Sequence, residues 1–230
     1  MRYSRATPSG VEARPGRLER AALSRQDGQE QQHYFTTDPE VPSDPVLVEE
    51  TVAGLRLRLW TDHGVFSRGH IDTGTRALIG AMVINAQERV LDWGAGYGVI
   101  GIAAALLEPE CHVTMVEVNR RAVELAQLNI RENGVANAEV IEGDAPGVLG
   151  ELRFDRILCN APVSRGRALV EAIIDDAAER LNPGGEFWAV IHTKKGARRY
   201  LQYMEQRFDT AWTETITGGY RVIVGRTAEG

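Results

Sequence analysis

The stretch Val90-Leu91-Asp92-Trp93-Gly94-Ala95-Gly96-Tyr97-Gly98-Val99-Ile100-Gly101 decides the fold class of this chain. An apolar run leads into glycines at every second position, and a second apolar run follows them. This pattern predicts a buried strand, a tight turn and the start of a helix. Glycines 94, 96 and 98 allow backbone angles that other residues avoid, and they let the N–H groups of the turn approach a ligand at the positive end of the helix. We therefore expect a nucleotide-like ligand at this turn.

The spacing of the glycines narrows the choice of ligand. A dinucleotide-binding turn has the pattern Gly-x-Gly-x-x-Gly, but Val99 stands where that pattern has its third glycine. The carboxylate of Asp92 would repel a pyrophosphate, whereas it suits a ligand that carries an amino group and a sulfonium. An NAD-dependent oxidoreductase is therefore a disfavoured alternative.

Acidic residues lie at the ends of the next two predicted strands. Glu117 comes near the end of the apolar run 113–118, where doubly wound folds place a carboxylate that binds ribose hydroxyls. The following strand runs into Gly143-Asp144-Ala145. Because the carboxyl ends of parallel strands meet at one edge of the sheet, we expect these acids and the glycine turn to face one crevice.

Strands and helices alternate from residue 89 onward, which indicates an α/β fold with a doubly wound, Rossmann-like, mostly parallel sheet. The strands are expected at 89–93, 112–118, 138–142, 154–160 and 186–192, with a final pair within 211–226. Because Gly218-Gly219 reads as a hairpin turn, this final pair is expected to be antiparallel. The helices are expected at 97–107, 120–132, 167–181 and 196–208, and an earlier helix is expected to open at Asp72 and run to about residue 84.

The region before this core divides into two parts. Residues 1–32 are rich in Arg, Gln, Gly, Ser and Pro, so we expect a mobile tail followed by a single domain over 33–230. In that domain, 33–71 is an extension to a core of 72–230. Alternating apolar residues on both sides of Ala53-Gly54 predict an N-terminal β-hairpin in the extension.

Composition excludes several classes of protein. With 43% hydrophobic and 25% charged residues, the chain is neither disordered nor fibrous. It contains no apolar run long enough to span a bilayer and no secretory signal, so we expect no membrane association and a cytoplasmic location. Cys111 and Cys159 match no metal-ligand spacing and the five histidines are scattered, so no metal site is expected.

The net charge of −6 argues against a large non-specific nucleic-acid surface. Local charge differs, however, because Lys-Lys-Gly-Ala-Arg-Arg occupies 194–199, and Arg165 and Arg167 follow the fourth strand. If both groups lie at the rim of the crevice, they form a basic patch on an acidic protein.

The run Asp92-x-Gly94-x-Gly96-x-Gly98 resembles motif I of the class I S-adenosylmethionine (SAM)-dependent methyltransferases, whose sheet also ends in an antiparallel pair. The resemblance implies that SAM is the cofactor and that an Asp at position 144 accepts a hydrogen bond from the adenine amine. The cofactor-binding residues implied so far are Asp92, Gly94, Gly96, Gly98, Glu117, Val118, Asp144, Ala145 and Asn160.

The fourth strand ends in Asn160-Ala161-Pro162-Val163. In methyltransferases that act on planar nitrogens, this position carries Asn-Pro-Pro and an aromatic residue. There the Asn oxygen and a neighbouring carbonyl accept the two N–H bonds of an amine whose lone pair is delocalised. The resemblance implies that Asn160, Ala161 and Pro162 are catalytic. Ala161 replaces the first proline and Val163 replaces the aromatic residue, so the stacking group has to come from elsewhere, with Phe66 as a candidate.

Sequence elements before the glycine turn narrow the choice of methyltransferase family. His33-Tyr34-Phe35, Gly64-Val65-Phe66-Ser67 and Asp72-x-Gly74-Thr75 resemble the small methyltransferase domain of the 16S ribosomal RNA guanine-N2 methyltransferases of the small subunit methyltransferase C type, over residues 33–226. This resemblance implies that Phe66 and Ser67 line the methionine end of the cofactor and that Thr75 helps to seat it. The substrate-binding residues implied are Phe66, Val163, Arg165 and Arg167.

The leading hypothesis is a SAM-dependent N-methyltransferase that modifies the exocyclic N2 amine of a guanine in 16S ribosomal RNA, with the RNA or the small ribosomal subunit as partner. The target base would have to be unpaired or flipped out of its helix. One alternative is methylation of a small molecule or a protein amide, and another is a SAM-binding protein without transfer activity. No pattern in the sequence indicates an oligomeric state.

Overall fold

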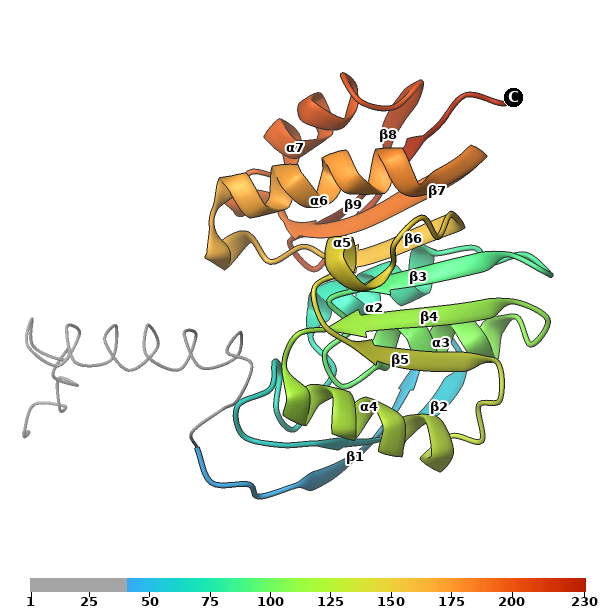
Figure 1. Cartoon of the computed structure of the whole chain (residues 1–230). Helices are drawn as coiled ribbons and strands as arrows, with labels where there is room; N and C mark the ends of the chain where they lie inside the picture. The colour runs from blue at the N-terminus through green and yellow to red at the C-terminus, as the bar shows by residue number, and fades with distance from the viewer. Residues whose placement is uncertain (1–40) are drawn as a thin grey trace, which may run out of the picture.

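The computed structural model describes residues 41–230, so the expected tail 1–32 and the element His33-Tyr34-Phe35 lie outside the described residues. The described part consists of a two-stranded sheet and a seven-stranded sheet with helices on both faces (Figure 1). The larger sheet has the order β5-β4-β3-β6-β7-β9-β8. Strands β5, β4, β3, β6 and β7 are parallel, and β9 pairs antiparallel with both β7 and β8. The bounds are β3 Arg89–Trp93, β4 His112–Glu117, β5 Ala138–Glu142, β6 Phe154–Asn160, β7 Leu181–His192, β8 Thr210–Thr217 and β9 Tyr220–Arg226. The predicted fold class, including the antiparallel C-terminal pair, is confirmed.

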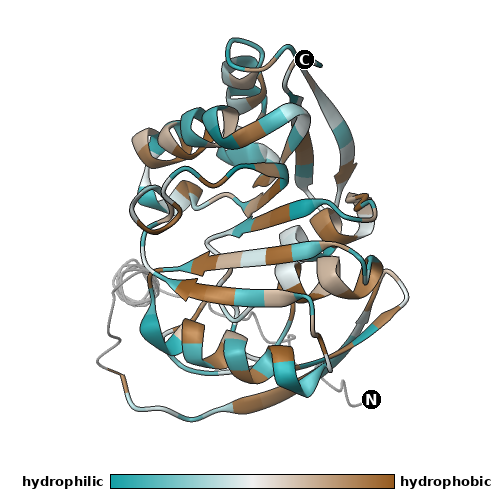
Figure 2. Ribbon diagram, turned by 45° about the vertical axis from the view of Figure 1, so that its right-hand side comes forward, coloured by the Kyte–Doolittle hydropathy of each residue, from teal (hydrophilic) through white to brown (hydrophobic). Residues whose placement is uncertain are grey.

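The helices cover the sheet in two layers. Alternate residues of a strand point to opposite faces, so Val90 and Leu91 of β3 belong to different cores. One core packs under α2 (Thr73–Ala81), α3 (Val99–Leu107) and α4 (Arg120–Glu132), and the other under α5 (Ala145–Val148), α6 (Arg167–Arg180) and α7 (Ala197–Met204). In Figure 2 apolar residues are prominent along the central strands and polar residues on the outer sides of the helices. No helix within residues 41–230 combines the length and the apolar composition needed to cross a bilayer.

Several element bounds differ from the prediction. Helix α3 begins at Val99 rather than at 97, because Gly98 still has a left-handed φ of 92°. Helix α7 ends at Met204 rather than at 208, and the short helix α5 was not predicted. The expected helix 167–181 and strand 186–192 left residues 182–185 between them, but these residues lie inside β7.

The run 182–185 forms an irregularity in β7. The pairing with β6 jumps from Phe154↔Leu181 to Arg156↔Glu186, so β7 has extra residues at this point. A Cβ added to Gly185 would lie 2.9 Å from the carbonyl oxygen of Asn182 and 3.0 Å from that of Asp155 on the neighbouring strand, so a side chain here would force the backbone to shift. The glycine that signals a turn therefore serves here for close backbone packing.

Asn129 of α4 and Asn133, the residue that caps its C-terminus, attach the N-terminal hairpin to the domain. The hairpin consists of β1 (Val46–Val52) and β2 (Leu55–Thr61). The side chain of Asn129 accepts from Trp60 N at 2.6 Å and donates to Trp60 O at 2.9 Å. Asn133 makes the same pair of bonds with Arg58, at 3.0 and 2.7 Å. Positions i and i+4 of a helix lie on one face, so these two amides match residues i and i+2 of the strand. The two amides thus provide hydrogen-bond partners for backbone groups at the free edge of β2, as a third strand would.

Asp92 links β3 to the start of α3. Its side chain is fully buried and its Oδ2 accepts from Gly101 N at 2.8 Å, while its Oδ1 has no partner among the described residues. Burial, only partly offset by the Gly101 bond, raises the pKa of Asp92 to about 7, and the nearby charge of Glu117 adds to the rise. By accepting from Gly101 N, this carboxyl therefore fixes the start of α3 relative to β3.

Asn129→Ala is expected to lower the free energy of unfolding by about 2–4 kcal/mol. The substitution leaves the N–H and C=O of Trp60 without their partner, and it also removes the 2.9 Å bond from Asn129 to Tyr97 O. Asn133→Ala, at a more exposed position where water can replace the amide, is the matched control and is expected to cost about 1 kcal/mol or less. Urea unfolding curves measure both, and equal effects would contradict this account.

Asp92→Asn is expected to change how stability depends on pH. Because the pKa of Asp92 is about 7 in the folded state and 3.8 for an ordinary aspartate, the folded state keeps a proton between about pH 4 and 7 that the unfolded state has lost. The contribution of Asp92 to the free energy of unfolding therefore falls as the pH rises through this range, by up to about 1.4 kcal/mol per pH unit. Asparagine can still accept from Gly101 N but does not titrate. Denaturant unfolding from pH 4 to 8 measures the free energy of unfolding of both proteins. As the pH rises, wild type should lose stability relative to Asp92→Asn, and this loss should level off above pH 7. A pH-independent difference would contradict the assignment.

Candidate functional site

A cavity of about 360 Å³ opens at the carboxyl ends of the central strands. It lies where the strand order reverses, with β4 on one side of β3 and β6 on the other, which is the usual ligand position in doubly wound sheets. The structure brings most of the predicted site residues together here. The lining includes Phe66, Ser67, Thr75, Gly94, Gly96, Glu117, Val118, Asp144, Ala145, Asn160, Ala161, Pro162, Val163 and Arg165. Asp92, Gly98 and Arg167 are not among the lining residues.

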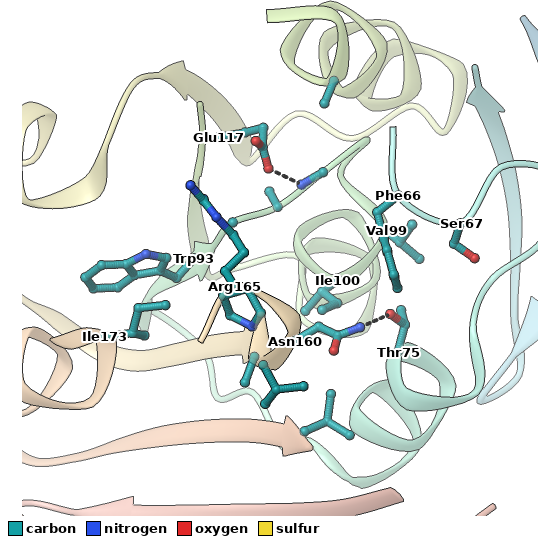
Figure 3. Close-up of a pocket in the computed structure, with 18 of the residues that line it drawn as sticks. Phe66, Ser67, Thr75, Trp93, Val99, Ile100, Glu117, Asn160, Arg165 and Ile173 are labelled. Carbon is teal, nitrogen blue, oxygen red and sulfur yellow. Dashed lines mark hydrogen bonds between the residues drawn. The ribbon is translucent and has the colours of Figure 1, made fainter. Parts of the chain in front are cut away.

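The glycine turn and Glu117 form one wall. Gly94 and Gly96 have φ angles of 71° and 57°, as the sequence pattern required. The Oε2 of Glu117 accepts from Gly96 N at 2.9 Å (Figure 3). Its Oε1 accepts from Asn119 N, also at 2.9 Å. Two backbone donors therefore hold this carboxylate in place at the end of β4, and each oxygen keeps lone pairs for further hydrogen bonds.

The loop that carries Phe66 is fastened over the cavity. Asn119 donates to Gly64 O at 2.9 Å, and the hydroxyl of Tyr97 lies 3.4 Å from Ser67 O and 3.3 Å from His70 O. The side chain of Phe66 is 46% exposed, although it lines the cavity. In Figure 3 its ring is directed toward the end of the cavity that holds Thr75 and Asn160. An exposed aromatic ring at a cavity mouth provides a flat apolar surface for a ligand.

The segment after β6 makes a tight turn. Val163 N donates to Ala161 O at 2.8 Å, and Pro162 has φ −78° and ψ 60°, which is an inverse γ-turn. One lone pair of the Ala161 carbonyl is therefore used inside the turn and the second is left. The Nδ2 of Asn160 donates to the hydroxyl of Thr75 at 3.1 Å (Figure 3), so the amide oxygen of Asn160 is free of that contact.

Charge is distributed unevenly around the cavity. Glu117 and Asp144 line the part formed by β4 and β5, whereas Asp72 lies beside Asn160 at the end of β6. On the side of β6 and β7, the segments 161–170 and 187–204 contain six Lys and Arg residues and no Asp or Glu. All six are exposed, and Arg165 and Lys195 line the cavity itself. Arg167 stands outside the lining and pairs with Glu171 at 2.6 Å.

The cavity also contains residues that the sequence analysis did not select, including Trp93, His192 and Tyr220. His192 ends β7 and pairs in register with Tyr220 at the start of β9, and their rings meet edge to face at 5.0 Å. The predicted strands could have indicated His192 and Tyr220 as site residues, because the end of one strand and the start of its antiparallel partner lie at the same edge of a sheet. No group of three or more His, Cys, Asp or Glu side chains suited to a metal ion occurs within residues 41–230.

Comparisons with known proteins identify relatives of this chain. It is 34% identical over 194 residues to the uncharacterized protein YbxB of Bacillus subtilis, which corresponds to 84% of this chain and 96% of that protein. It is 33% identical over 203 residues to the ribosomal RNA small subunit methyltransferase C of Escherichia coli, covering 83% of this chain and 56% of that enzyme.

A solved structure extends the comparison. The 16S rRNA guanine-N2 methyltransferase of T. thermophilus, in complex with AdoMet and guanosine, matches with a TM-score of 0.71 and 26% identity, over 82% of this chain and 52% of that one. This chain thus spans about half the length of the two ribosomal RNA methyltransferases. The family model for the methyltransferase small domain matches residues 56–224. The chain belongs to the methyltransferase small domain family.

Proposed function

We propose that this chain is a SAM-dependent N-methyltransferase that methylates the exocyclic N2 amine of a guanine in 16S ribosomal RNA. The family and the relatives support methyl transfer and an RNA acceptor. The observation that carries the proposal is the polarity of the cavity, which is acidic on the side of β4 and β5 and basic on the side of β6 and β7.

The acidic side fits SAM, which carries a sulfonium cation. Glu117 is the acceptor for the ribose hydroxyls, and Asp144 with Ala145 lies where the adenine would be held. Phe66 and Ser67 are placed to contact the methionine end. Gly98 acts through the backbone of the glycine turn and Asp92 through its bond to Gly101 N in α3, since neither residue lines the cavity. When bound, SAM supplies the electrophilic methyl group.

Asn160 and Ala161 are the acceptors for the amine of the substrate. The lone pair of an exocyclic amine is delocalised into the ring, so two fixed acceptors help to pyramidalise the nitrogen and aim it at the methyl carbon. The amide oxygen of Asn160 and the second lone pair of the Ala161 carbonyl can fill these roles. Rate enhancement then comes from orientation and from the electrostatic stabilisation of the positive charge that develops on nitrogen.

The basic side fits a phosphodiester chain. SAM is not an anion, so a group of exposed cations on this side of the cavity is poorly explained by the cofactor. Lys194, Lys195 and Arg198 form no ion pair with any residue of the described part of the chain. Lys and Arg side chains arranged in this way neutralise backbone phosphates. A small neutral amine or a protein amide would not require them.

Phe66 supplies the flat surface that Val163 lacks. A base flipped out of its helix loses its stacking neighbours, and an aromatic side chain restores part of that energy. A ribosomal RNA substrate also places the protein in the cytoplasm, with the RNA or the small ribosomal subunit as its partner.

Ribosomal RNA from cells with and without the gene should differ at one guanine, detected by nucleotide-resolution mapping of N2-methylguanine. Asn160→Ala should abolish this methylation, because one of the two acceptors is lost, while calorimetry should give the same SAM affinity within about threefold. Unchanged ribosomal RNA, together with transfer to a small amine, would contradict the proposed acceptor.

Charge reversal of Lys194, Lys195 and Arg198 to Glu should lower kcat/KM for RNA by more than about tenfold. It should also reduce the slope of log affinity against log salt by about 2, because each of three lost contacts to the phosphates of a single strand removes about 0.7. SAM affinity should not change. The matched control reverses three exposed arginines on β2 and α4, namely Arg56, Arg120 and Arg131. Equal losses in both variants would show that only overall charge matters.

A further inference from the structure

Three polar side chains from two separate elements form a hydrogen-bonded chain at the acceptor end of the cavity. Asp72 precedes α2, Thr75 lies in its first turn and Asn160 ends β6. Asn160 Nδ2 lies 3.1 Å from Thr75 Oγ1 and 3.4 Å from Asp72 Oδ2, and the Thr75 hydroxyl donates to Asp72 Oδ2. All three residues line the cavity, and Thr75 is only 5% exposed.

The direction of these bonds follows from the number of protons. A threonine hydroxyl has one proton, and Thr75 gives it to the Asp72 carboxylate. The lone pairs of Thr75 therefore face Asn160, together with Asp72 Oδ2. Only the NH₂ end of the Asn160 amide can bond to two acceptors, whereas its oxygen would be repelled by both.

Capping of α2 does not account for this arrangement. The cap is made by Asp72 Oδ1, which accepts from Gly74 N at 2.9 Å and from Thr75 N at 3.2 Å. The second oxygen, Oδ2, contributes nothing to the cap and faces the Thr75 hydroxyl and Asn160 instead.

We propose that Asp72 and Thr75 are positioning residues that fix the amide of Asn160 with its oxygen toward the substrate. This inference rests on the proposed function, in which that oxygen accepts an N–H of the target amine. A flipped amide would present its NH₂ group to the N–H bonds of the amine. Both groups are hydrogen-bond donors, so no hydrogen bond could form. The negative charge of Asp72 also polarises the chain of hydrogen bonds and strengthens the Asn160 oxygen as an acceptor. The structure thus gives Thr75 a role toward the acceptor in addition to any contact with the cofactor.

Two substitutions at Thr75 separate the hydroxyl from packing. Thr75→Val keeps the shape and removes the hydroxyl, so the Asn160 amide loses its directing partner. We expect kcat to fall by about 10- to 100-fold, as small losses of orientation produce. The kcat is measured at saturating SAM, so that a weakened cofactor contact of Thr75 does not affect it, and KM for RNA and the melting temperature should stay close to wild type. Thr75→Ser restores the hydroxyl and should recover kcat to within about threefold. Equal kcat for the Val and Ser variants would overturn the proposal.

Asp72→Asn tests the charge without removing the cap, since asparagine caps helices as well as aspartate. Its new NH₂ group would donate to Thr75, and the Thr75 proton would then turn to Asn160 and favour the flipped amide. We expect the loss of kcat to resemble that of Thr75→Val at unchanged stability. Wild-type kcat in Asp72→Asn would overturn the role of the charge.

A second readout separates this inference from the proposed function. If wild type methylates no RNA, the proposed function fails, and the positioning role is then judged from the NH₂ resonances of Asn160 in NMR spectra, assigned by their loss in Asn160→Asp. Hydrogen exchange of that group should be slowed in wild type and Thr75→Ser and faster in Thr75→Val. The same exchange rate in all three proteins would overturn the positioning role.

Discussion

Gly94, Gly96 and Gly98 all have left-handed backbone angles, and the rest of the site depends on this turn. A residue with a Cβ would pay about 1–2 kcal/mol at each position, so the turn requires glycine. The path of the backbone directs Gly96 N to the Glu117 carboxylate. It also places Tyr97 between two other parts of the domain. The carbonyl of Tyr97 accepts from Asn129, the residue that holds the hairpin, and its hydroxyl contacts the loop of Phe66.

The arrangement of charge follows from the order of the strands. The sheet places β4 and β5 on one side of β3 and β6 and β7 on the other, so the residues that follow each strand gather at opposite ends of one cavity. Acids follow the first group and cations follow the second. This polarity is the basis of the proposal that one cavity binds a cationic cofactor at one end and a polyanionic acceptor at the other. The net charge of −6 conceals this polarity, because it averages over the whole surface.

Strand and helix periodicity predicted the larger elements well, because buried strands and amphipathic helices have strong local patterns. The prediction failed where one local signal has two uses. Gly184-Gly185 resembles a turn, yet Gly185 packs closely against the Asp155 carbonyl inside β7. Asp92 precedes the first glycine of a ligand-binding turn, yet its carboxylate points under that turn to Gly101 N. Neither outcome can be read from spacing, because each depends on a neighbour brought close by the fold.

The sequence alone determined the type of turn, the alternation of strands and helices, and the set of residues at the strand ends, since these follow from backbone sterics and hydrophobic periodicity. Only the tertiary structure decided how the polar groups are paired. Asn160 and Thr75 are 85 residues apart, and their contact exists because α2 packs beside the end of β6. The orientation of the Asn160 amide follows from that contact, because a hydrogen bond has a direction that depends on which partner carries the proton.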